Sequence, residues 1–169
     1  MFTLVIGGSA SGKSEYAERQ VAALPGRRWY IATMEPWDDE CLARIAKHQN
    51  ARAQRDFTTV ECYRNLPALD LPPEGNVLLE CLGNLVANEL YGPEAGGAAR
   101  VLAGIDHLLN TCTHLTVVTN EVFSGGAEYE GDTLRYLKDL AWVNRMLAQK
   151  ADRVVELVCG LPNVLKEAL

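Results

Sequence analysis

Residues 7–14 read GGSASGKS and directly follow the apolar stretch FTLVI at residues 2–6. The octapeptide satisfies every fixed position of the pattern G-x-x-x-x-G-K-[ST], and a helix-forming stretch follows it from Lys13 to about Leu24. Glycines let backbone N–H groups wrap a phosphate chain, Lys13 reaches the β and γ phosphates, and the Ser14 hydroxyl binds Mg²⁺. The sequence therefore predicts a phosphate-binding loop between a first strand and a first helix, with a nucleoside triphosphate as its ligand.

Apolar stretches and helical patterns alternate along the rest of the chain. Strands are expected at residues 28–32, 57–61, 76–80, 115–121 and 153–158, and helices at 39–51, 81–90, 98–112 and 132–149, the last capped by Asp132. The segment 66–75 is expected to be a loop, and GLP at 160–162 is expected to end the last strand. The apolar runs of the strands are continuous, which is typical of strands covered on both faces. We therefore predict one α/β domain over residues 1–169, a three-layer P-loop NTPase with a mostly parallel central sheet.

The composition argues against several classes of protein. With 22 acidic and 16 basic residues the chain has a net charge of −6, which disfavours a nucleic-acid or anionic membrane surface. No apolar run approaches the roughly 20 residues that a membrane-spanning helix needs. The five cysteines are odd in number and form no C-x-x-C pair, so we expect reduced thiols in the cytoplasm and neither a disulfide framework nor a zinc site.

Several polar residues end the predicted strands, and the carboxyl ends of parallel strands meet at one edge of a sheet, where ligands bind. They are Ala32 and Thr33, Glu61, Glu80, and the pair Asn120 and Glu121. One acid at this edge should hold Mg²⁺ together with Ser14. Glu80 is our first candidate and Glu121 our second, each against the alternative of a solvated loop carboxylate or a helix cap.

A second unusual stretch is RIAKHQNAR at residues 44–52. On a helix, residues four apart share a face, so Arg44, His48 and Arg52 form one stripe with Arg55 nearby. Two flanking cations favour a neutral imidazole, which is a competent nucleophile toward phosphorus, and the arginines could hold phosphate oxygens. From the residues alone, the favoured alternative is a solvated basic helix face with an incidental histidine.

A series of motifs in order spans nearly the whole chain. They are GGSASGKS, YIAT (30–33), DDE (38–40), RIAKHQNAR, TVE (59–61), LLEC (78–81), TNEV (119–122), R-x-L-x-D-x-x-x-x-N (135–144), and ADRVVELVCGLP (151–162) with Lys166 near the end. This series resembles the bifunctional adenosylcobinamide kinase / adenosylcobinamide-phosphate guanylyltransferase family. The phosphate loop alone is shared by many families, whereas R-I-x-x-H-x-x-x-R together with T-N-E-V is much more specific.

The resemblance implies two reactions in assembly of the nucleotide loop of cobalamin. ATP or GTP phosphorylates adenosylcobinamide, and GMP from GTP is then transferred to that phosphate through a guanylylated histidine, which would be His48. It also implies a RecA-like core, a homotrimer and a catalytic role for His48, beside the catalytic role of Lys13 and the metal ligands Ser14 and Glu80 that the motif and the strand ends predict. The implied nucleotide contacts are Gly7, Gly8, Ser9, Ala10, Ser11, Gly12, Lys13, Ser14, Ala32, Thr33, Met34, Gln49, Asn50, Ala51, Arg52, Glu61 and Glu80.

The chain departs from the family pattern at a few positions. Many members have arginine where this chain has Ala10, and a G-x-G-I-V-P loop where it has FSGGAEYEG at 123–131. Neither change touches Lys13, Ser14 or His48. A plain small-molecule kinase, in which His48 only binds phosphate, stays open as the alternative. A regulatory GTPase is disfavoured because the chain has neither N-K-x-D nor D-x-x-G.

Overall fold

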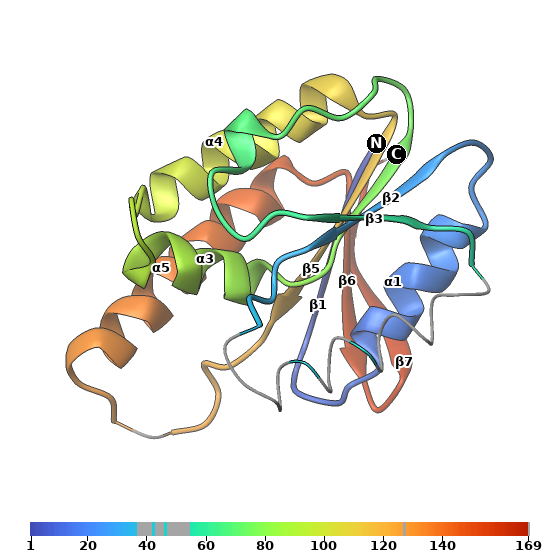
Figure 1. The fold of residues 1–169 in the computed structure, drawn as a ribbon. Coiled ribbons are helices and arrows are strands. Elements are labelled where there is room, and N and C mark those ends of the chain that lie inside the picture. Colours follow the sequence, from blue (N-terminus) through green and yellow to red (C-terminus); the bar gives the residue numbers. More distant parts are fainter. Residues whose placement is uncertain (37–41, 43–45, 47–54, 127, 169) are drawn as a thin grey trace.

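A seven-stranded sheet organises the described part of the chain, which in this computed structural model comprises all residues except 37–41, 43–45, 47–54, 127 and 169. The strands are β1 (Phe2–Gly7), β2 (Arg28–Ala32), β3 (Thr58–Glu61), β4 (Asn76–Leu79), β5 (His114–Asn120), β6 (Arg153–Val158) and β7 (Leu161–Glu167). Their order across the sheet is β3-β2-β4-β5-β1-β6-β7 (Figure 1). All neighbours pair in parallel except β6 and β7, which confirms the mostly parallel sheet.

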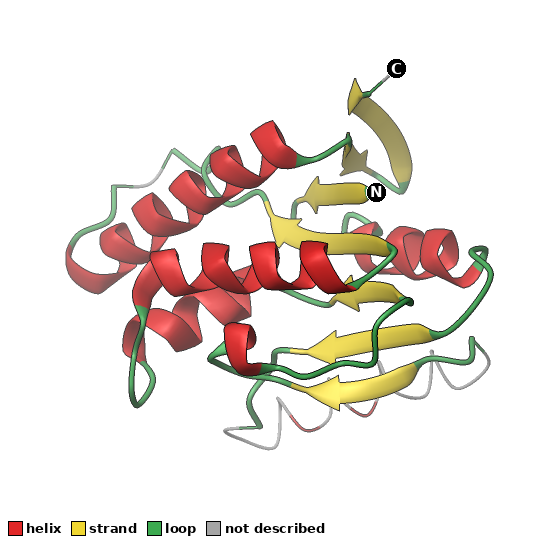
Figure 2. Ribbon diagram, turned by 90° about the horizontal axis from the view of Figure 1, so that it is seen from above, coloured by secondary structure: helices red, strands yellow, loops and turns green. Residues whose placement is uncertain are grey.

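Helices cover both faces of this sheet. The helix α1 (Lys13–Ala22) packs on one face, and α3 (Leu82–Tyr91), α4 (Gly97–Thr111) and α5 (Gly131–Lys150) pack together on the other (Figures 1 and 2). Each face has its own cluster of buried apolar side chains. Successive residues of β1 show the division, because Leu4 joins the larger cluster beneath α3 to α5 and Val5 joins the smaller cluster beneath α1. The three-layer α/β architecture is thus confirmed, and it explains why the strands are apolar throughout.

The end of the chain differs from the sequence-based expectation. Residues 160–162 do not end the sheet, because the chain reverses at Cys159 and Gly160, both of which have positive φ, and returns as the antiparallel strand β7. Every residue of β7 is exposed, so the strand has no buried face to produce an alternating apolar pattern. The amine of Lys166 donates to the carbonyls of Ala148 and Gln149, which ties β7 to the end of α5.

Smaller differences concern helix ends. Glu130, and not Asp132, is the N-cap of α5, and Asp132 lies in its first turn, where a carboxylate favours the helix dipole. The region predicted as the loop 66–75 contains the short 3₁₀ helix η1 (Leu66–Ala68). The helix expected at 39–51 lies outside the described residues, apart from Leu42 and Ala46, which are helical.

Two expectations from composition bear on the described residues. None of the described helices is long and apolar enough to cross a membrane. Cys62, Cys81, Cys112 and Cys159 carry free thiols.

The close packing of α4 on η1 depends on a glycine. A Cβ atom at Gly104 would lie 2.6 Å from the Cβ of Leu66, whose side chain is completely buried. Contacts this short do not occur between real side chains, so a larger residue would have to push α4 away from η1.

We therefore expect Gly104→Ala to destabilise the fold by about 1–3 kcal/mol, the typical cost of overpacking a core. Helix propensity alone predicts the opposite sign, since alanine is favoured over glycine in a helix by about 1 kcal/mol. Equilibrium unfolding in urea measures the difference. The control is Gly125→Ala, where nothing lies within 4 Å of the added carbon and a change of less than about 0.5 kcal/mol is expected. A stabilised Gly104→Ala protein would contradict the proposed packing.

Candidate active site

The loop that joins β1 to α1 folds back over the end of β1. The carbonyl of Gly8 accepts hydrogen bonds from the Lys13 amine at 2.9 Å and from the Ser11 backbone N–H at 3.3 Å. Gly12, the N-cap of α1, has φ of 89°, which only glycine adopts without strain. A Cβ at Gly7 would lie 2.5 Å from the Ser11 hydroxyl oxygen and 2.9 Å from the Leu157 carbonyl oxygen. Both glycines are therefore required by the geometry of the loop.

A cavity of about 770 Å³ opens beside this loop. Its described walls come from the loop, α1, and the segments that follow β2, β4 and β5. Eight of the predicted site residues line it, namely Ser9, Ala10, Ser11, Gly12, Lys13, Ser14, Met34 and Glu80. A cavity of this size matches the range of roughly 300–1,000 Å³ that small-molecule sites occupy.

Strand register explains why these residues meet. Gly7 of β1 pairs with Asn120 of β5, and Leu79 of β4 pairs with Val117 of the same strand. Residues that follow β1, β4 and β5 therefore leave the sheet at one edge. Asn120 and Glu80 both reach the cavity from there.

The second acid that we considered for the metal, Glu121, lies elsewhere. Its backbone N–H donates to the Gly7 carbonyl at 3.0 Å, and its carboxylate accepts a hydrogen bond from the Phe123 N–H at 3.0 Å. Glu121 does not line the cavity, so of the two acids only Glu80 faces the phosphate loop.

Burial shapes the electrostatics of the cavity. Desolvation lowers the pKa of Lys13 below its ordinary value of 10.5, and the neighbouring Cys81 partly opposes this shift. Burial also raises the pKa of the Cys81 thiol, which therefore stays protonated and neutral beside the lysine at neutral pH. A half-buried ammonium in a low-dielectric wall interacts more strongly with an incoming anion than a fully solvated one does.

Two polar atoms on the walls of the cavity have no hydrogen-bond partner among the described residues. They are the Ser11 hydroxyl oxygen and the Asn84 side-chain nitrogen. Buried polar groups are nearly always paired in folded proteins. Both atoms are themselves buried from solvent, so they belong to the packing behind the cavity wall.

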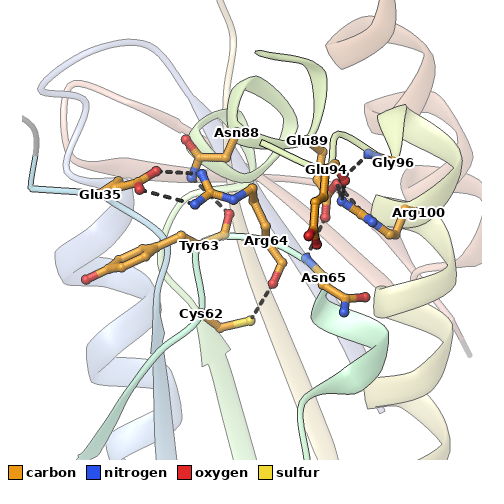
Figure 3. Close-up of polar contacts among 10 residues, drawn as sticks. All are labelled: Glu35, Cys62, Tyr63, Arg64, Asn65, Asn88, Glu89, Glu94, Gly96 and Arg100. Carbon is orange, nitrogen blue, oxygen red and sulfur yellow. Dashed lines mark hydrogen bonds and ion pairs between the residues drawn. The ribbon is translucent and has the colours of Figure 1, made fainter. Parts of the chain in front are cut away.

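The ends of β2 and β3 are held in place by α3. The Asn88 amide of α3 donates to the Thr33 carbonyl at 2.9 Å and to the Tyr63 carbonyl at 3.0 Å, and Figure 3 shows Asn88 beside Tyr63. The Thr33 hydroxyl, which is completely buried, donates to the Cys81 carbonyl at 2.8 Å. The side chain of Thr33 thus joins the ends of β2 and β4 and does not line the cavity, whereas the next residue, Met34, does.

Carboxylates complete this support (Figure 3). Arg64 binds both oxygens of Glu35, at 2.7 and 3.2 Å. The buried carboxylate of Glu89 accepts hydrogen bonds from the backbone N–H groups of Asn65 and Gly96 and pairs with Arg100. Bidentate and charge-assisted hydrogen bonds are the strong ones in proteins, so the chain after β2 is firmly positioned before it reaches residue 37.

The remaining predicted residues are placed as follows. Four of them do not line the cavity, namely Gly7, Gly8, Ala32 and Thr33. Glu61 is exposed and accepts a hydrogen bond from the Tyr63 hydroxyl at 2.9 Å. His48 and Gln49, Asn50, Ala51 and Arg52, like Arg44, lie outside the described residues.

Seven residues beyond the predicted nucleotide and metal contacts also line the cavity, namely Glu15, Glu18, Arg55, Cys81, Asn84, Asn120 and Val122. Of these, Asn120 was expected at this edge of the sheet as the end of a strand. Several had a sequence signal. Glu18 lies one helical turn after Ser14, and Asn84 lies in the first turn of the helix that follows Glu80. Arg55 lies near the predicted basic stripe, but its place on this cavity depends on a contact with Glu18, which is distant in the sequence.

The donor set suits Mg²⁺. The Ser14 hydroxyl and the Glu80 carboxylate supply oxygen atoms to the same cavity. Mg²⁺ prefers oxygen ligands and is typically held by one or two protein groups together with substrate phosphates and water. The described residues contain no cluster of three or more His, Cys, Asp or Glu side chains that could form an all-protein metal site.

Comparison with known proteins gives a concordant result. Residues 3–165 match the family described as cobinamide kinase / cobinamide phosphate guanyltransferase. The chain is 37% identical to the bifunctional adenosylcobalamin biosynthesis protein CobU of Salmonella typhimurium, over 95% of this chain and 97% of that one. It is 34% identical to the protein of the same name in Escherichia coli, with 95% and 97% covered. It is 30% identical to the CobP protein of Pseudomonas aeruginosa, with 98% of both chains covered.

Among solved structures, the chain is similar to the P4 protein from bacteriophage phi6 in complex with ADP. The TM-score is 0.43 at 12% identity, covering 97% of this chain and 52% of that chain.

The lowered pKa of Lys13 has a measurable consequence. The ammonium of the free protein loses its proton below the ordinary lysine pKa of 10.5, so triphosphate affinity should fall as the pH rises, with a midpoint below 10.5. Titration calorimetry with the α,β-methylene analogue of ATP, repeated from neutral to alkaline pH, measures this midpoint.

Lys13→Ala should bind weakly and lose the alkaline midpoint. Cys81→Ser controls for titration of the neighbouring thiol and should keep it. A midpoint at or above 10.5, or an unchanged profile in Lys13→Ala, would show that Lys13 does not govern binding.

Proposed function

The chain belongs to the cobinamide kinase / cobinamide phosphate guanyltransferase family, and on this basis we infer that it catalyses both reactions of that name. It is a bifunctional enzyme of cobalamin biosynthesis, an adenosylcobinamide kinase and adenosylcobinamide-phosphate guanylyltransferase. The observation that carries this conclusion is the match over residues 3–165, which includes a complete phosphate loop that lines the large cavity. The assignment of individual residues to the two reactions is our proposal.

In the kinase reaction, the phosphate loop binds the β and γ phosphates of ATP or GTP. Backbone N–H groups of residues 8–14 and the Lys13 ammonium stabilise the negative charge on the γ-phosphoryl group as it moves to the hydroxyl of adenosylcobinamide. Ser14 and Glu80 would hold Mg²⁺, which supplies further neutralisation of the phosphate charge. The half-buried position of Lys13 supports this role, because desolvation strengthens its attraction for phosphate.

In the guanylyltransferase reaction, His48 is the nucleophile. Its imidazole nitrogen forms a bond to the α-phosphorus of GTP, and pyrophosphate leaves. A phosphate oxygen of adenosylcobinamide phosphate then attacks the same phosphorus, the P–N bond breaks, and adenosylcobinamide-GDP is released. A covalent intermediate divides one difficult displacement into two easier ones.

The surroundings of the nucleotide are proposed from the same resemblance. The proposed contacts with the nucleotide are Met34, which lines the cavity, together with Ala32, Thr33, residues 49–52 and Glu61. Thr33 is completely buried, with its hydroxyl donating to the Cys81 carbonyl, so its contact with the nucleotide would require the chain after β2 to shift. We place the enzyme in the cytoplasm, which agrees with its free thiols.

We also propose that the enzyme is a homotrimer and that β7 lies at the contact between subunits. Leu161, Val164 and Leu165 are 72%, 45% and 58% exposed on this edge strand, and Val158 at the end of β6 is 52% exposed. An exposed apolar edge strand promotes association unless another chain covers it. A second copy of the chain is the partner that the family resemblance implies.

Guanylylation should be detectable without the corrinoid acceptor. Incubation with GTP labelled at the α-phosphate, followed by denaturation, should leave acid-labile, alkali-stable label on the protein and release pyrophosphate. His48→Ala should abolish both signals.

In the same variant, transfer of a γ-label from ATP to adenosylcobinamide should persist, because Lys13 and the loop are intact. That transfer is the control for folding. Label that survives His48→Ala would refute the histidine mechanism, and kinase activity with no label on the unmodified chain would favour a plain kinase.

Charged substitutions on β7, followed by sedimentation, test the proposed trimer contact. Leu161→Asp combined with Leu165→Asp should reduce the sedimenting mass from that of three chains toward that of one, because burial of an unpaired carboxylate is costly. Asn163→Lys adds a charge to the same strand without removing an apolar side chain, can pair with Glu156, to which Asn163 donates, and should leave the trimer largely intact. A double variant that still sediments as three chains would exclude β7 from the contact.

A further inference from the structure

Arg55, which follows the predicted basic stripe, lies on the wall of the phosphate cavity. Its Nη1 atom lies 2.5 Å from the Oε2 atom of Glu18 on α1. Glu18 is in the helical turn after Ser14, so α1 presents the carboxylate on the side that carries the end of the phosphate loop. The guanidinium of Arg55 is thereby held beside the helix that begins at Lys13.

The two partners differ in exposure. The Glu18 side chain is 5% exposed and the Arg55 side chain is 25% exposed. A carboxylate buried to this extent is costly unless it is paired, so Glu18 fixes the position of Arg55 strongly. Arg55 also lines the cavity, so its less buried side chain can be reached from there.

The ion pair with Glu18 leaves most of the N–H donors of Arg55 available. A guanidinium carries five N–H donors in a rigid plane. Glu18 is the one hydrogen-bond partner that the described residues provide for Arg55, through Nη1. The remaining donors can bind a phosphate oxygen without breaking the ion pair, and the fixed plane lowers the entropy lost when they do so.

The charges of the cavity also favour a second cation. The described charged residues on its walls are the carboxylates Glu15, Glu18 and Glu80 and the cations Lys13 and Arg55. Because Glu18 is paired with Arg55, two carboxylates remain on the described walls, those of Glu15 and Glu80, and both repel a triphosphate. Without Arg55, Lys13 would be the one described cation that attracts it. Hydrogen bonds from Arg55 would offset that repulsion.

We propose that Arg55 is a phosphate-binding residue of the nucleotide site and that Glu18 is the positioning residue that holds its guanidinium toward the cavity. The ligand class is a chain of phosphates, as in a nucleoside triphosphate. This deepens the proposed function and rests on it only for the identity of the nucleotide. The competing explanation is an ion pair that merely fastens residue 55 to α1.

Binding of inorganic triphosphate separates the two explanations, because this probe has no base and cannot guanylylate the protein. Arg55→Gln removes the arginine partner of the buried Glu18 carboxylate. The informative variant is therefore Glu18→Gln with Arg55→Gln, which removes both charges and keeps hydrogen-bonding groups. Calorimetric titration should show a loss of affinity of about tenfold or more, as expected for a charge-assisted contact. Arg55→Lys should lose part of that affinity, and Glu18→Gln alone should also weaken binding, because the guanidinium is no longer held.

The matched control removes the Lys150–Asp106 ion pair, which lies outside the cavity, by Lys150→Gln with Asp106→Asn. It should leave the affinity unchanged. Thermal melting establishes that each protein is folded before titration. A folded Glu18→Gln/Arg55→Gln protein with unaltered triphosphate affinity would overturn the proposal.

Failure of the proposed function would look different. In that case the α-label experiment on His48 would fail, while the dependence of triphosphate binding on Arg55 would persist.

Discussion

The absence of a side chain at Gly7 is the constraint on which the site depends. Gly7 ends β1, and a side-chain carbon there would collide with the Ser11 hydroxyl and with the carbonyl of Leu157 in β6. This close approach lets the chain reverse over its own strand, and the positive φ of Gly12 then starts α1. The Lys13 amine is consequently held against the Gly8 carbonyl at the edge of the sheet where the other parallel strands end. Strand β1 lies between β5 and β6, so the loop is supported on both sides.

A second layer of polar contacts turns this edge into a defined cavity. Asn88 joins the ends of β2 and β3, Thr33 joins β2 to the residue after β4, and Arg64 clamps Glu35 in the chain that leaves β2. Asn88 and Thr33 bind backbone carbonyls, Arg64 binds a side-chain carboxylate, and none of the three lines the cavity. Their role is to keep the cavity walls at Met34 and Cys81 in place, so that binding does not have to order them.

The fold was largely predictable from sequence, because the phosphate loop and the continuous apolar strands each require particular residues. The exception is β7, which has no buried face and follows the turn at Gly160 that the sequence marked as the end of the last strand. The site was only partly predictable. The loop residues and Glu80 followed from motif and strand end, whereas Arg55 reaches the cavity through an ion pair with a residue 37 positions away. Thr33 is the opposite case: it lies at the predicted strand end, but its hydroxyl binds the Cys81 carbonyl and supports the fold.

Both reactions are proposed to use one cavity, with the phosphate loop binding the triphosphate in each. The most direct measurement is the number of nucleotide sites per chain. The α,β-methylene analogues of ATP and GTP resist attack at the α-phosphorus, so calorimetric titration with each, and then with one in the presence of the other, reports binding alone. One site per chain is expected, with each analogue displacing the other and neither binding tightly to Lys13→Ala. Two sites per chain that fill independently would contradict a shared cavity.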